Sequence, residues 1–147
     1  MGVAALISWV ITAFGGLYLL VIWLIENEAS ERGATATRLP LPVISGHALL
    51  ALAGLSLWIV YLLADRGVLA WGAVVILAVV TVLGLTMAFR WIRVYRTPLP
   101  AGGSAIVDTL AVPAERNFPL FVVLGHGLLG VTTIVLVVLT ALGVGES

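Results

Sequence analysis

The segment 39-LPLPVISGHALLALAGLSLWIVYLL-63 decides the fold, because a second copy of it follows 79 positions later. The second copy is 118-FPLFVVLGHGLLGVTTIVLVVLTAL-142, and it aligns with the first without a gap. The alignment pairs Pro40 with Pro119, Gly46 with Gly125 and His47 with His126. The chain contains no other histidine. A repeated Gly-His inside two long apolar segments is therefore the strongest indication of function in this sequence.

The composition predicts a membrane protein. Hydrophobic residues make up 62% of the chain and charged residues 10%, whereas a water-soluble domain carries about 25% charged residues. Four apolar segments without a charged side chain each reach the length of about 20 residues that a spanning helix needs. They cover about residues 3–25, 41–63, 68–89 and 118–142. We therefore expect an all-α integral membrane four-helix bundle that forms one transmembrane domain over residues 1–147.

The repeat divides this domain into two tandem similar helical hairpins, at about residues 1–66 and 67–147. A shift of 68 positions also places Gly16 on Gly84 and Trp23 on Trp91, although these two matches alone do not exclude chance. Tandem two-helix units keep one orientation in the membrane. We therefore expect the two histidines at equal depth, about 10 Å along their helices from the matched prolines.

The arginines predict the orientation of the chain. All seven basic residues are arginine, and six of them would share one side of the membrane: Arg32, Arg38, Arg90, Arg93, Arg96 and Arg116. Basic loops favour the cytoplasmic side, so we expect a bacterial inner (plasma) membrane protein with both termini outside. The lipid bilayer is the first expected partner. A net charge of zero gives no electrostatic basis for binding nucleic acid.

The two histidines allow two interpretations. In the first, each imidazole hydrogen-bonds to a neighbouring helix and holds the bundle together. The protein is then a non-catalytic accessory or assembly subunit of a larger membrane complex. In the second, His47 and His126 ligate one haem b, because a six-coordinate haem iron needs one imidazole nitrogen on each face of the porphyrin.

Other residues near the histidines suit the second interpretation. Four glycines would let a porphyrin approach the helix backbones: Gly46, Gly54, Gly125 and Gly130. Arg38 and Arg116 precede the two matched prolines and would neutralise the haem propionates at the water interface. Ser45 and Thr133 are candidates for orienting the imidazoles, since metal-bound histidines usually bond a second partner.

With two histidines in a four-helix span, the chain resembles the small four-helix membrane cytochromes b of the cytochrome b561 type and the haem-bearing anchors of respiratory enzymes. The resemblance consists of this architecture and of His47 and His126. It implies electron transfer in a respiratory or redox membrane system, with a quinone or respiratory complex subunits as partners. Two-haem members have four histidines, so this chain would ligate one haem at most. A haem between the two chains of a homodimer is a second arrangement.

Other chemistry has less support in the sequence. A zinc or copper site would need more ligands than two histidines, and the chain has no cysteine. Ser45 lies two positions from His47, and such close neighbours on a helix do not face each other as a nucleophile and its base would. We therefore expect a protein that is not an enzyme by itself.

Overall fold

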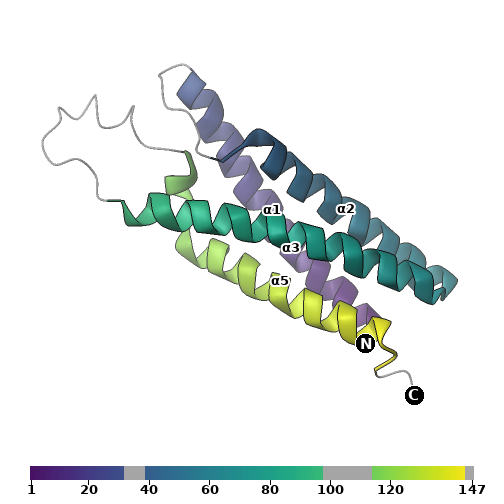
Figure 1. Ribbon diagram of the computed structural model, residues 1–147. Helices are drawn as coiled ribbons and strands as arrows, with labels where there is room; N and C mark the ends of the chain where they lie inside the picture. Colours follow the sequence, from purple (N-terminus) through teal and green to yellow (C-terminus); the bar gives the residue numbers. More distant parts are fainter. Residues whose placement is uncertain (32–38, 98–113, 145–147) are drawn as a thin grey trace, which may run out of the picture.

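The computed structural model describes residues 1–31, 39–97 and 114–144 and shows long helices packed as a bundle (Figure 1). These helices are α1 (Gly2–Glu31), α2 (Leu41–Ala64), α3 (Gly67–Arg96) and α5 (Leu120–Ala141). A short 3-10 helix, η1 (Ala114–Asn117), precedes α5. The prediction of an all-α protein with four long apolar helices is confirmed.

Each of the four long helices is long and apolar enough to cross a membrane. Their outer surfaces agree with this, because large apolar side chains such as Phe14, Val82, Phe121 and Leu128 are more than 60% exposed. A soluble monomer rarely exposes so much contiguous apolar surface. Helices α1 and α3 extend beyond the predicted apolar segments, to Glu31 and Arg96. Their last turns carry the charged residues that the apolar segments lack.

The two repeated segments begin their helices in the same way. Pro40 and Pro119 are the N-caps of α2 and α5, and both have an extended backbone conformation. Proline suits this position because the first N–H groups of a helix have no partner inside the helix. At the other end of α2, Asp65 adopts a left-handed conformation (φ 49°) and its N–H donates to the carbonyl of Tyr61. The chain can therefore reverse directly into α3.

The bundle consists of two closely packed helix pairs. Helix α2 packs most extensively on α3, and α1 packs most extensively on α5, while the α1–α2 and α3–α5 interfaces are smaller. Helices α2 and α5 are not among the extensively contacting pairs of the described chain, so they lie at opposite corners. The closest pairings are consequently not those within the two repeat halves. Side chains of α2 and α5 that point inward can therefore meet at the centre of the bundle.

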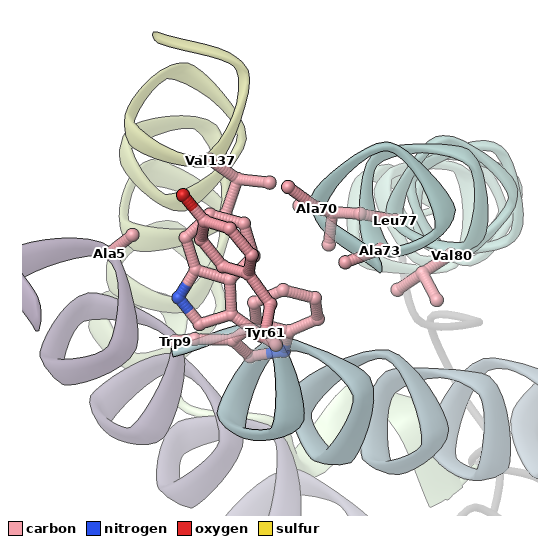
Figure 2. Close-up of a cluster of buried hydrophobic side chains, with 9 residues drawn as sticks. Ala5, Trp9, Tyr61, Ala70, Ala73, Leu77, Val80 and Val137 are labelled. Atoms are coloured by element: carbon pink, nitrogen blue, oxygen red, sulfur yellow. The ribbon is translucent and has the colours of Figure 1, made fainter. Parts of the chain in front are cut away.

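One end of the bundle, toward the turn between α2 and α3, holds a compact core (Figure 2). Trp58 is fully buried there, and its Nε1 donates to the carbonyl of Gly2 at 3.2 Å. The repeat is visible in burial: Ala5 and Ala73, which are 68 positions apart, are both 0% exposed. Trp58 and Val137, which are 79 positions apart, are also both 0% exposed. Both offsets found in the sequence therefore mark equivalent interior positions.

Candidate functional site: a pair of imidazoles in the bundle interior

The side chains of His47 on α2 and His126 on α5 meet inside the bundle. Their ring centroids lie 6.2 Å apart, and the ring planes make an angle of 63°. Each histidine is the seventh residue after its matched proline, as the repeat requires. The two rings therefore lie at the same level of the bundle.

Each imidazole is fixed by a hydrogen bond to the backbone of a neighbouring helix. Nδ1 of His47 lies 3.0 Å from the carbonyl oxygen of Val80 on α3, and Nδ1 of His126 lies 2.9 Å from that of Thr12 on α1. A carbonyl oxygen only accepts, so Nδ1 carries the hydrogen in both rings. The lone pair of each neutral ring is then on Nε2, and neither Nε2 has a hydrogen-bond partner within the described chain.

Two glycines make room for the rings. A Cβ added at Gly16 would lie 2.9 Å from Cε1 of His126, and a Cβ added at Gly84 would lie 3.1 Å from Cε1 of His47. Gly16 comes four residues after Thr12, whose carbonyl bonds His126. In the same way, Gly84 comes four residues after Val80, whose carbonyl bonds His47. The match of Gly16 with Gly84 at an offset of 68 therefore corresponds to equivalent positions in the structure.

The four glycines named from the sequence have different surroundings. A Cβ at Gly54 would lie 3.0 Å from Trp9 and 3.1 Å from Ile76, so this glycine serves helix packing. A Cβ at Gly46 would be 3.6 Å from Leu83, which is ordinary contact. Cβ atoms at Gly125 and Gly130 would meet no described atom within 4 Å. Sequence reasoning thus missed Gly16 and Gly84, the two glycines closest to the imidazole rings, although the 68-residue offset signalled them.

The hydroxyl groups named as orienting partners have other roles. Ser45 Oγ donates to the carbonyl of Leu41 at 2.8 Å, a bond within its own helix that serine often forms. Thr133 Oγ1 is 2.8 Å from Ser8 Oγ and therefore joins α5 to α1. The expectation that Ser45 and Thr133 orient the imidazoles is wrong. Backbone carbonyls take this role because the glycines let each ring lie against the neighbouring helix.

The arginine prediction can be examined at one of its two positions. Arg38 lies outside the described residues. Nη1 of Arg116 donates to the carbonyls of Val94 and Thr97, at 3.2 and 2.8 Å, and so caps the C-terminal end of α3. Nε and Nη2 of Arg116 make no hydrogen bond to the described residues.

The spacing of the rings fits two axial ligands of one metal. An imidazole nitrogen lies about 2 Å from the metal it binds, and about 1 Å from the centre of its own ring. Two ligands on opposite sides of one iron therefore have ring centres about 6 Å apart, in agreement with the observed 6.2 Å. The described residues contain no group of three His, Cys, Asp or Glu that could hold a metal without a macrocycle.

The fold and the site together define a multi-pass membrane protein, by helix length and hydropathy, with two imidazoles anchored toward each other in its interior. No protein-family model, no curated protein and no solved structure matches the chain.

Proposed function

We propose that this protein binds one haem b through His47 and His126 and transfers electrons within a respiratory or other redox system of the membrane. The observation that carries the proposal is the imidazole pair itself: two rings from opposite corners of the bundle, 6.2 Å apart, each held through Nδ1 with Nε2 unpartnered. A bound haem would supply a one-electron redox couple. Such an assembly carries electrons rather than converting a substrate by itself.

The chain's own residues would hold and tune the haem. The Nδ1–H bonds to Val80 and Thr12 fix the direction of each ring and make the other nitrogen a better ligand. Gly16 and Gly84 keep the space that the rings occupy. The surrounding apolar helices limit access of water, and burial together with axial hydrogen bonding sets the reduction potential of a haem.

The absorbance spectrum of the purified protein tests this proposal. We expect a Soret band that sharpens and shifts on reduction with dithionite, with the form typical of bis-histidine ligation. His47→Asn and His126→Asn should each abolish that spectrum, because asparagine can keep the bond from its amide to the carbonyl but offers no imidazole nitrogen. Ser45→Ala is the matched control and should leave the spectrum unchanged. A colourless wild-type protein that is stably folded would refute haem binding.

A second candidate function is favoured by the same two hydrogen bonds. His47 links α2 to α3 and His126 links α5 to α1, so the imidazoles could serve only as interhelical bonds in an accessory or assembly subunit. The asparagine variants separate the two functions. For an accessory subunit, asparagine should preserve thermal stability better than alanine does, and no variant should differ in colour.

The proposed orientation places η1 and the C-terminal ends of α1 and α3 in the cytoplasm, following the arginines. A membrane quinone or the subunits of a respiratory complex are then the proposed electron partners. Cysteines introduced at Asp65 and Asn117 of this cysteine-free chain should react with an impermeant thiol reagent from opposite sides of the membrane. The haem-to-protein ratio distinguishes a haem within one chain (one) from a haem shared by a homodimer (one half).

A further inference from the structure

The indole of Trp91 on α3 has a buried hydrogen-bond donor without a partner among the described residues. Trp91 is 6% exposed, and its Nε1 makes no hydrogen bond to residues 1–31, 39–97 or 114–144. Its ring packs against Tyr95, with centroids 5.2 Å apart, but this contact does not involve a hydrogen bond. Buried side-chain donors are nearly always satisfied, and leaving one unpaired costs about 1–3 kcal/mol. A buried donor of this kind indicates that a hydrogen-bond acceptor binds next to the indole of Trp91.

The position of Trp91 along the bundle suggests what this acceptor is. Trp91 lies seven residues after Gly84, on the same face of α3 and about 10 Å further along the helix. Gly84 lies against His47, so it marks the level of the imidazoles on α3. Because α3 runs antiparallel to α2, residues after Gly84 on α3 approach the level of Pro40, where α2 begins. The indole N–H is therefore between the imidazole pair and the polar end of the bundle.

Arg116 lies at the same end. Its Nη1 bonds the carbonyl of Val94, three residues beyond Trp91, while Nε and Nη2 have no partner among the described residues. A guanidinium carries five N–H donors, and the two on Nη1 are the ones used by α3. Within the described residues, the indole N–H therefore lacks an acceptor, and so does part of a guanidinium that bonds α3 about one turn further along. A carboxylate suits both donors, the indole N–H and the guanidinium, because it only accepts hydrogen bonds.

We infer that Trp91 Nε1–H donates a hydrogen bond to a carboxylate of the bound haem, beside the guanidinium of Arg116. The inference rests on the proposed function and adds a positioning residue to it. A haem carries its two carboxylates on one edge, and that edge would face the polar end of the bundle. The counterpart of Trp91 on α1, Trp23, is also buried but already has an interaction of its own.

The test compares Trp91→Phe with the wild type in haem titration and redox titration. Phenylalanine keeps an aromatic ring and removes only the N–H, so the bis-histidine spectrum should persist. The haem dissociation constant should rise about tenfold, as expected for a lost hydrogen bond to a charged group. The resonance Raman bands of the propionate groups should also shift. Trp71→Phe is the control, because Trp71 is on the same helix but 48% exposed near its other end.

A haem with esterified carboxylates separates loss of the bond from loss of folding. With this haem, the difference between wild type and Trp91→Phe should shrink well below tenfold, because the charged acceptor is absent. An equal difference with both haems would mean that the variant only disturbs the packing, and it would overturn the inference. So would a variant with unchanged affinity and unchanged propionate bands. If the wild type binds no haem at all, the proposed function itself fails, a result that is distinct from these.

Discussion

The two ends of the bundle are built from the same four apolar helices but are filled in different ways. Toward the turn between α2 and α3, Trp9, Trp58 and Tyr61 pack among the small side chains of Ala70 and Ala73 (Figure 2). Here large rings fill the centre, and alanines allow the helices to approach. This end has the close packing expected of a protein interior.

At the level of the histidines, the interior contains two imidazoles and, on the neighbouring helices, Gly16 and Gly84. The second cluster of buried apolar residues, Trp23, Leu39 and Ile44, lies beyond this level and is much smaller. Because lipid gives no hydrophobic driving force between helices, van der Waals packing and hydrogen bonds hold such bundles together. The densest packing and the proposed haem site therefore lie at different levels of the bundle, so substitutions should separate stability from the proposed haem binding.

The largest expected effect is that of Trp58→Ala at the packed end. Trp58 is fully buried and bonds the carbonyl of Gly2, so its truncation leaves a cavity and removes this bond. We expect a loss of about 3 kcal/mol or more in the free energy of unfolding. The spectrum of the folded fraction should not change. Unfolding in detergent measures the loss, and Trp71→Ala, at an exposed position, should cost far less. A comparable loss at Trp71 would contradict the location of the core.

A methyl group added at each end gives the next largest effect. In Gly54→Ala the new Cβ would lie 3.0 Å from Trp9, so overpacking should cost about 1–3 kcal/mol of stability. In Gly84→Ala it would lie 3.1 Å from Cε1 of His47 and should push that ring out of line. For Gly84→Ala we expect the haem affinity to fall about tenfold or more, since a ligand displaced by a fraction of an ångström loses much of its bond. Its stability should fall less than that of Gly54→Ala.

Gly125→Ala is the control for both variants, because its added Cβ would meet no described atom within 4 Å. It should unfold as the wild type does, apart from a small gain in helix propensity. The same ranking of Gly54→Ala and Gly84→Ala in both assays would show that the two ends do not have separate roles.

The sequence predicts most of this fold, because apolar length and a gapless repeat are local features. Pro40 and Pro119 mark the first turns of their helices, and the repeat places both histidines at one depth. The pairing of helices is not a local feature. The sequence does not predict that α1 pairs most extensively with α5, because none of the four helices is strongly amphipathic.

The partners of the imidazoles depend on that pairing, so they could not be read from the chain. Ser45 was a candidate because it is close in sequence, yet its hydroxyl bonds its own helix. The carbonyls of Thr12 and Val80 carry no sequence signal, since every residue has a carbonyl. Among the groups around the imidazoles, only Gly16 and Gly84 have a signal in the sequence, which is their offset of 68 positions.

The smallest expected effect concerns a bond between the two ends. Thr133 Oγ1 is 2.8 Å from Ser8 Oγ and joins α5 to α1, near the Thr12 carbonyl that holds His126. Thr133→Val keeps the shape and removes this bond, so we expect a loss of about 0.6 kcal/mol in stability, typical of hydrogen bonds between membrane helices. Thr132→Val is the control, because the exposed Thr132 bonds only its own helix. The haem spectrum should be the same in both variants, since neither hydroxyl contacts an imidazole. A shifted reduction potential in Thr133→Val with unchanged stability would instead assign this hydroxyl to the haem end.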